Sequence, residues 1–180
     1  MTSAFQHQGR GWRLRHTFFL PALAWAAVSA TALPEPAVAQ IAAAELQSAV
    51  RSAVRRDREI ARFYQARRYQ PLWVRNGTVG GEARQLLHLL ETADADGLDP
   101  RTYRPDAVAA AIANAERGRR RDLARAEILL STTFANYVRD VRRARDMGVI
   151  YTEAHYRPSV PTRTEALEMA ASAPDLQTYL

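Results

Sequence analysis

The chain has 180 residues, a length that allows about one domain, and it carries a formal net charge of +6. It contains no cysteine, which excludes a disulfide framework, a thiol nucleophile and thiolate metal ligands. All its basic residues are arginine, and many alternate with acids, as in Arg55-Arg56-Asp57-Arg58-Glu59. That alternation is more typical of a solvated helix face than of a phosphate-binding track, so we expect no nucleic acid partner.

Residues 1–39 have the three parts of a secretory signal peptide. A basic stretch comes first, with Arg10, Arg13 and Arg15. An apolar run over residues 18–32 follows, shorter than the roughly 20 residues that a membrane-spanning helix needs. Ala37 and Ala39 then form an A-x-A cleavage signature ahead of Gln40. We therefore expect export to the periplasm and cleavage before Gln40, with no retained membrane anchor; an uncleaved anchor is the alternative.

After the signal peptide the apolar spacing is helical. From Ile41 to about Tyr64, apolar residues recur every three or four positions, which predicts one amphipathic helix with an arginine-rich outer face. The period breaks over residues 69–74, because Pro71 favours an extended conformation at the residue before it. Asn76-Gly77 predicts a turn.

Helical spacing resumes after this break. Asp99 is suited to cap a helix that begins at Pro100, and Thr162 with Glu165 fits a capping box. Further helices are predicted over residues 82–93, from Pro105 to Gly118, over 122–143 and from 162 onward. The fold class we expect is mainly α: a single helical domain of about five to six helices with one short extended segment.

The residues that could carry chemistry form no self-sufficient active site. His88 has only Glu91 as a metal-ligating neighbour one turn away, and His155 has no cysteine to activate. Ser131 lies inside a predicted helix rather than in a G-x-S-x-G elbow. The terminal glutamate of a calcium loop is missing after Asp94, Asp96 and Asp99. We expect no catalytic residue, no metal and no cofactor.

Several short motifs nevertheless occur in a fixed order. They are Phe63-Tyr64, then Tyr69-Gln70-Pro71-Leu72-Trp73, Gly97-Leu98-Asp99-Pro100 and Leu129-Leu130-Ser131. In this order and spacing they resemble the scaffold domain of large exported L,D-transpeptidases, the enzymes that cross-link peptidoglycan. The resemblance covers about residues 57–180. It implies a periplasmic scaffold whose partner is peptidoglycan or a cell-wall enzyme.

The catalytic part of that family does not match anything in this chain. In such enzymes the scaffold is followed by a β-rich domain with an S/T-H-G-C segment, whose cysteine forms a thioester with a peptide stem. No such segment occurs here. The resemblance therefore implies a scaffold domain that is not an enzyme on its own: a truncated product, one piece of a split gene, or a partial gene model.

We accordingly expect a signal peptide over 1–39, an alanine- and arginine-rich helical lead-in over 40–56, and the scaffold domain over 57–180, cut short at its end. Two other functions stay open. One is a stand-alone periplasmic binding protein for peptidoglycan or a cell-wall partner. The other is an arginine-rich module for anionic lipid or wall polymers.

The aromatic residues of the motifs have two interpretations. Trp73 and its neighbours could stack on the sugar rings of a glycan strand, or they could anchor the core where a helix meets a loop. We favour the core role, because each aromatic side chain can bury a large apolar area.

Overall fold

The computed structural model describes residues 35–54, 57–143 and 159–174. Most of the predicted signal peptide, His155 and the residues after 174 lie outside these ranges. The described part is mainly α, as the sequence predicts. Its elements are α1 (Glu35–Ala53), α2 (Arg58–Ala66), β1 (Val74–Arg75), β2 (Thr78–Val79), α3 (Gly81–Glu91), the 3-10 helices η2 (Ala93–Asp96) and η3 (Pro100–Tyr103), α4 (Pro105–Ala115), α5 (Arg120–Arg142) and α6 (Arg163–Ser172).

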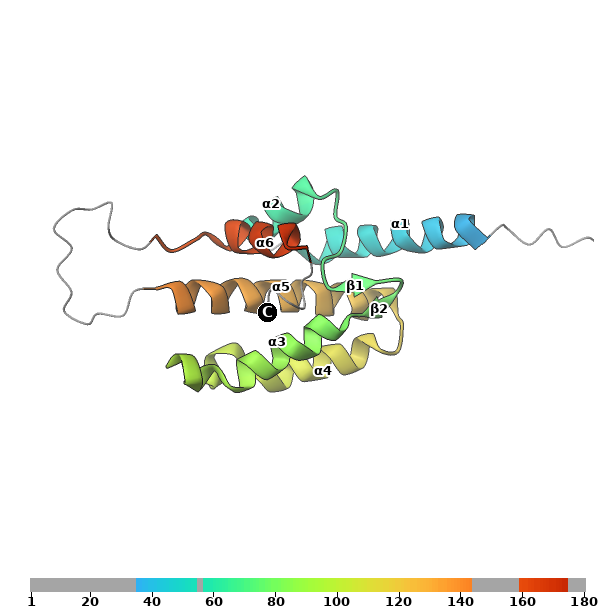
Figure 1. The fold of residues 1–180 in the computed structure, drawn as a ribbon. Helices are drawn as coiled ribbons and strands as arrows, with labels where there is room; N and C mark the ends of the chain where they lie inside the picture. Colours follow the sequence, from blue (N-terminus) through green and yellow to red (C-terminus); the bar gives the residue numbers. More distant parts are fainter. Residues whose placement is uncertain (1–34, 55–56, 144–158, 175–180) are drawn as a thin grey trace, which may run out of the picture. The chain divides into compact units, whose positions relative to one another are not determined.

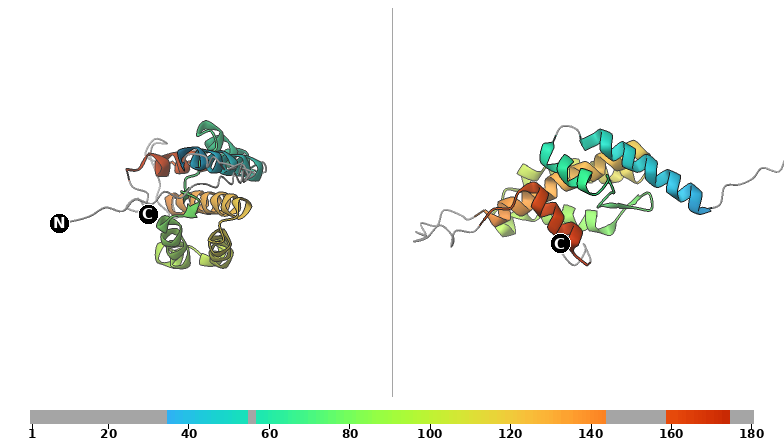
Figure 2. Two further views of the ribbon diagram at one scale, coloured as in Figure 1. Left: turned by 90° about the vertical axis from the view of Figure 1, so that its right-hand side faces the viewer. Right: turned by 90° about the horizontal axis from the view of Figure 1, so that it is seen from above.

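The helices form three layers with α5 in the middle. On one side α5 packs against α1, α2 and α6, and on the other side against α3 and α4 (Figure 1). The view turned by 90° about the vertical axis shows the same three layers (Figure 2). Because α5 is covered on both sides, its buried positions include Ala126, Leu130 and Phe134. Phe63 of α2 and Leu167 of α6 contribute buried side chains to the same core.

The prediction of a single helix from Ile41 to Tyr64 is wrong. The first helix already begins at Glu35 and ends at Ala53, and a second one begins at Arg58. The physical reason is Asp57, whose carboxylate accepts hydrogen bonds from the N–H groups of Glu59 (3.1 Å) and Ile60 (3.3 Å) and so caps α2. A side chain that satisfies the first N–H groups of a helix favours a new start over continuation.

Only part of the segment predicted as extended, residues 69–74, has an extended backbone. Arg68 and Tyr69 are left-handed, with φ of 54° and 62°. Further on, the predicted turn at Asn76-Gly77 joins β1 and β2 in an antiparallel hairpin, with Val74 opposite Val79. Positive φ at both turn residues, 52° and 75°, gives the twist that a two-residue hairpin requires. The strands themselves were not predicted, since two residues are too short to show alternation.

The predicted helix caps are confirmed. The carboxylate of Asp99 accepts from the N–H of Arg101 at 3.0 Å, and Pro100 begins η3. Thr162 and Glu165 form both hydrogen bonds of a capping box at the start of α6. None of the described helices is both long enough and apolar enough to cross a membrane.

Candidate functional site

A buried carboxylate lies at the centre of the fold. Glu127, in the middle of α5, is 0% exposed. Its carboxylate accepts hydrogen bonds from the hydroxyl of Tyr64 (2.5 Å) and from the backbone N–H groups of Leu72 (2.5 Å), Trp73 (3.0 Å) and Val74 (3.0 Å). None of the ion pairs recorded between described residues involves this carboxylate. The charge-bearing group is therefore held by O–H and N–H donors from α2 and from the segment before the hairpin.

Ser131 completes this arrangement one turn further along α5. Its hydroxyl oxygen accepts a hydrogen bond from the indole N–H of Trp73 (2.9 Å) and lies 2.6 Å from the hydroxyl oxygen of Tyr64. The indole of Trp73 also packs edge-on against Phe134, with ring centroids 5.7 Å apart. We call Glu127, Ser131, Tyr64 and residues 72–74 the Glu127 node.

The electrostatics of the node favour a structural role. Burial raises the pKa of Glu127, while the hydrogen bonds from Tyr64 and the backbone N–H groups act in the opposite direction. Burial and the neighbouring Glu127 raise the pKa of the Tyr64 phenol well above its ordinary value. The phenol is therefore a stable donor. Because Ser131 and Glu127 are both fully buried and hydrogen bonded, the node can hold segments together but cannot meet a substrate.

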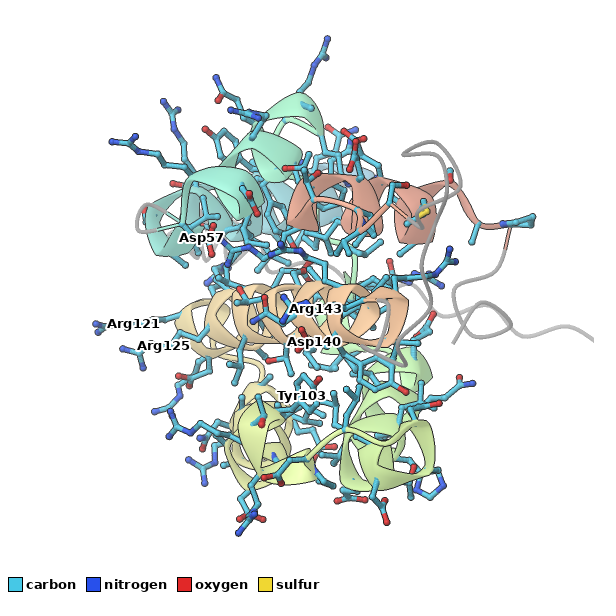
Figure 3. The ribbon with its side chains drawn as sticks, turned by 90° about the vertical axis from the view of Figure 1, so that its left-hand side faces the viewer. Asp57, Tyr103, Arg121, Arg125, Asp140 and Arg143 are labelled. Carbon is cyan, nitrogen blue, oxygen red and sulfur yellow. The ribbon has the colours of Figure 1, made fainter. Side chains whose placement is uncertain are left out.

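Two tyrosine–aspartate pairs flank the Gly97-Leu98-Asp99-Pro100 motif and tie it to α5. The hydroxyl of Tyr103 in η3 donates to Asp140 of α5 at 2.9 Å, and that of Tyr137 in α5 donates to Asp96 of η2 at 2.5 Å. The two phenol rings meet edge to face, 5.6 Å apart. Burial raises the pKa of both phenols, that of Tyr137 to about 12. Figure 3 shows Tyr103 next to Asp140, with Arg143 close by.

Helix α6 is tied to the start of α2 by charge. The guanidinium of Arg163 donates to Asp57 (2.6 Å) and to Glu59 (2.8 Å). The hydroxyl of Thr164 adds a hydrogen bond to the backbone carbonyl of Glu59 at 3.0 Å. The hydrogen bond from Arg163 lowers the pKa of Glu59. These contacts between residues about a hundred positions apart hold α2 and α6 together in the layer that covers α5.

The residues of the first of these two motifs, Tyr69-Gln70-Pro71-Leu72-Trp73, differ in their surroundings. Leu72 and Trp73 are buried, Pro71 and Tyr69 are half-buried, and Gln70 is exposed. The guanidinium of Arg51 lies 5.5 Å from the ring centroid of Tyr69. With 1% of its surface exposed, Trp73 cannot present its face to a sugar ring in this structure.

In the second, Gly97-Leu98-Asp99-Pro100, Gly97 is left-handed at φ 69° and ends η2, and Asp99 is exposed at the start of η3. Leu98 is half-buried against the core. The two motifs are thus brought onto the same helix, the first at Glu127 and Ser131 and the second through the flanking tyrosine–aspartate pairs.

The remaining predicted positions lie outside this site. Ala39 and Gln40 are exposed in α1, the side chain of Ala37 is not described, and processing between Ala39 and Gln40 stays a prediction. His88 is exposed, as expected of a surface histidine. Across the described ranges, no group of three His, Asp or Glu side chains is placed to hold a metal ion.

Sequence reasoning missed Glu127, although a signal for it exists. The residue occupies the same helical stripe as Leu123, Leu130 and Phe134, at spacings of three and four. A lone acid on an otherwise apolar stripe of a helix is an expected buried carboxylate, because such a position faces the core.

Comparison with known proteins gives one match. A model of the family described as Scaffold domain matches residues 58–180. This span begins at the first residue of α2 and contains the Glu127 node, both anchored motifs and α6. No curated protein and no solved structure matches the chain.

Proposed function

Because this chain belongs to the Scaffold domain family, we propose that it is the non-catalytic scaffold part of an L,D-transpeptidase-type system that acts in peptidoglycan assembly. The observation that carries the proposal is the family match over residues 58–180, which contains in order the motifs that resemble the scaffold of those enzymes. The proposed location is the periplasm, reached through the predicted signal peptide.

The geometry supports a positioning role. A scaffold must keep its surface segments in fixed relative positions. Here α2, β1 of the hairpin, η2 and η3 are each hydrogen bonded to a side chain of α5, namely Glu127, Tyr137 or Asp140. Water solvates these polar groups when the chain is unfolded. In the folded chain, each group depends on its protein partners to complete its hydrogen bonds.

The chemistry of L,D-transpeptidases also supports a non-catalytic role. The reaction of these enzymes proceeds through a cysteine thioester, and these 180 residues contain no cysteine. The thiol that the reaction requires must come from another chain or from a part of the protein beyond this sequence. The scaffold then contributes the orientation of a partner or of the wall, and the partner contributes the nucleophile.

The proposal is tested in two steps. First, the purified chain is incubated with tetrapeptide-bearing muropeptides, and we expect no cross-links above a buffer blank. Second, the chain is depleted in the producing cell, and we expect fewer transpeptidase-type cross-links in the wall, restored by the wild-type chain.

Cross-linking by the purified chain would refute the non-catalytic role, and an unchanged wall would refute the role in assembly. Retention on purified sacculi at high salt, with unchanged cross-linking, would instead support the stand-alone binding protein.

A further inference from the structure

One end of the molecule carries a concentrated positive charge. Arginine occupies every position from 117 to 121 except Gly118, in the turn from α4 into α5, and all four side chains are exposed. Arg119 pairs with Asp122, and Arg120 pairs with Glu45 of α1. For Arg117 and Arg121 no ion pair with a described residue is recorded. We call residues 117–121 the arginine turn.

The cationic surface continues along α5. Arg125 follows Arg121 one turn later, and its guanidinium lies 3.7 Å from the carboxylate of Asp122. Figure 3 shows the side chains of Arg121 and Arg125 extending from α5 away from the body of the fold. Their guanidinium groups are therefore accessible to a partner that is large and flat as well as to a small one.

This charge is placed where it opposes folding. The amino end of a helix has a partial positive charge, so cations there are unfavourable and acids are favoured. Arg119 stands at the capping position of α5 and makes no side-chain capping bond, and Arg120 and Arg121 follow it. Replacing Arg121, for which no ion pair with a described residue is recorded, would be expected to stabilise the fold slightly. Ion pairs account for Arg119 and Arg120, but no ion pair recorded with a described residue accounts for Arg121 in the first turn of α5.

An apolar pocket adjoins the arginine turn. It has a volume of about 590 Å³ and lies between α1, the segment before the hairpin and the start of α5; its lining includes Ala42, Ala43, Leu46, Pro71, Val74 and Leu123. Arg120 lines this pocket and also a neighbouring one of about 790 Å³, which Arg121 and Arg125 line as well. Apolar surface and guanidinium groups thus meet at Arg120.

An exposed apolar side chain lies beside this junction. Ile41 is 50% exposed and precedes Glu45, the partner of Arg120, by one helical turn on the same side of α1. An aliphatic side chain next to a cationic cluster is the combination that binds a lipid–water interface, because the cations meet headgroups and the aliphatic group enters the acyl boundary.

We propose that this end of the molecule binds the surface of a membrane that contains anionic phospholipids. The lipid phosphates are bound by the arginine turn and Arg125, whose planar guanidinium groups match phosphate oxygens in pairs. The apolar part of one lipid enters the pocket lined by Ala43 and Leu46. A carboxylate-bearing peptide would pair with the arginines too, but it would leave the apolar pocket and Ile41 in water.

The test uses the full chain as it is recovered from the producing cell, with whichever amino terminus it carries. It is sedimented with vesicles of phosphatidylcholine alone and with vesicles that contain about one quarter phosphatidylglycerol, at low and at physiological salt. We expect binding to the anionic vesicles and little to the neutral ones, weakening as salt screens the charges.

Two double substitutions with the same loss of charge distinguish a specific role of the arginine turn from a general effect of net charge on binding. Arg117→Gln with Arg121→Gln removes two side chains for which no ion pair with a described residue is recorded, and binding should fall roughly tenfold to thirtyfold. The control, Arg58→Gln with Arg142→Gln, removes two exposed arginines from α2 and from the far end of α5. Its binding should stay within about twofold of the wild type.

A second pair of variants tests the pocket. Ala43 lines it, whereas the next residue, Ala44, lines neither pocket, and both are exposed. Ala43→Glu should weaken binding to anionic vesicles roughly fivefold, and Ala44→Glu clearly less. Circular dichroism on every variant confirms that each one is folded.

Equal binding to neutral and anionic vesicles would overturn the proposal, and so would equal losses in the two double variants. Retention on an immobilised acidic peptide with no retention on anionic vesicles would assign the arginine turn to a peptide instead. Equal effects of Ala43→Glu and Ala44→Glu would remove the pocket from the binding surface. The outcome is independent of the cross-linking experiments, which do not involve lipid.

Discussion

The hydroxyl of Tyr64 donates a hydrogen bond of 2.5 Å to the carboxylate of Glu127, 63 positions later in the chain, and both side chains are 0% exposed. This bond joins α2 to α5 inside the core. Because the same carboxylate also accepts from the backbone of residues 72–74, its loss would leave several buried donors without a partner.

Replacing the carboxylate should destabilise the fold strongly. We expect Glu127→Ala to lower the free energy of unfolding by at least about 3 kcal/mol, since each buried donor that loses its acceptor costs roughly 1–3 kcal/mol. Glu127→Gln keeps one acceptor oxygen and should cost less. Urea unfolding measures both, with the exposed Glu168→Gln as control. An alanine variant as stable as the control would mean that water replaces the carboxylate at little cost.

The raised pKa of Glu127 makes its contribution depend on pH. A carboxyl that holds its proton more tightly in the folded state contributes stability that is fully present below the unfolded pKa, close to the ordinary value of 4.5, and lost as pH rises through the folded pKa. The advantage of the wild type over Glu127→Gln should therefore shrink as pH rises above 4.5. Urea unfolding of both proteins from pH 4 to pH 8 measures this difference, in which titrations common to both cancel. A gap that widens with pH would show that the hydrogen bonds outweigh the burial.

Trp73 should be required for stability rather than for binding. Its ring is buried against Phe134 and its indole N–H is bonded to Ser131. Trp73→Ala should cost roughly 3–5 kcal/mol through lost burial and the cavity left behind. Trp73→Phe fills most of the space and loses the hydrogen bond, so it should cost less. Thermal melts on both variants, with a sacculus pull-down on the same samples, decide the role. Unchanged melting with lost retention would assign Trp73 to glycan binding.

The ion pairs of Arg163 should hold α6 in place, with a modest contribution. The side chain of Arg163 is 26% exposed and that of Glu59 is 38% exposed, so solvent screens the pair, and Arg163→Gln should cost about 1 kcal/mol. The pKa of Glu59 is lowered, so this contribution is present above its unfolded pKa and lost as pH falls through the folded value.

Acid titration of stability in the wild type and in Arg163→Gln measures the contribution of this pair. The more exposed pair of Arg84 and Glu116 serves as control, and Glu116→Gln should change little. Equal effects of the two substitutions would mean that Arg163 stabilises no more than a surface ion pair.

Of the three tryptophans in these 180 residues, processing before Gln40 would leave Trp73 alone, since Trp12 and Trp25 precede the cleavage site. Sequencing of the exported protein should start at Gln40. Its tryptophan fluorescence should be shifted to short wavelength, as expected of a buried indole. Recovery of a membrane-anchored chain that still begins at Met1 would contradict this prediction.

The features that were predicted correctly from the sequence are those that a residue and its near neighbours in the chain determine. The helix starts at Pro100 and Arg163 follow from caps one to three residues away, and the Asn76-Gly77 turn follows from the conformations that those residues allow. The helix break at Asp57 was missed because the apolar spacing continues through it. There the capping residue outweighed the periodicity.

The apolar stripe of α5 could have indicated that Glu127 is buried, but the partners of its carboxylate could not be predicted. Its donors come from Tyr64 and from backbone groups of residues 72–74, and backbone N–H groups leave no signature in the sequence. Only the fold brings them to one carboxylate. The arginine turn was visible in the sequence, but its position beside an apolar pocket was not, since the pocket is formed by three separate segments.

The links of α2 also constrain the order in which the chain can acquire its structure. A helix of nine residues is not stable alone, and the partners that fix α2 are Glu127 and Arg163, 63 and 104 positions after Tyr64 and Glu59. The bond to Glu127 can form once α5 is in place, whereas the ion pairs with Arg163 have to wait for α6, the last described helix. Closing the longer of these two loops costs more entropy, so the docking of α6 is the step that completes the surroundings of α2.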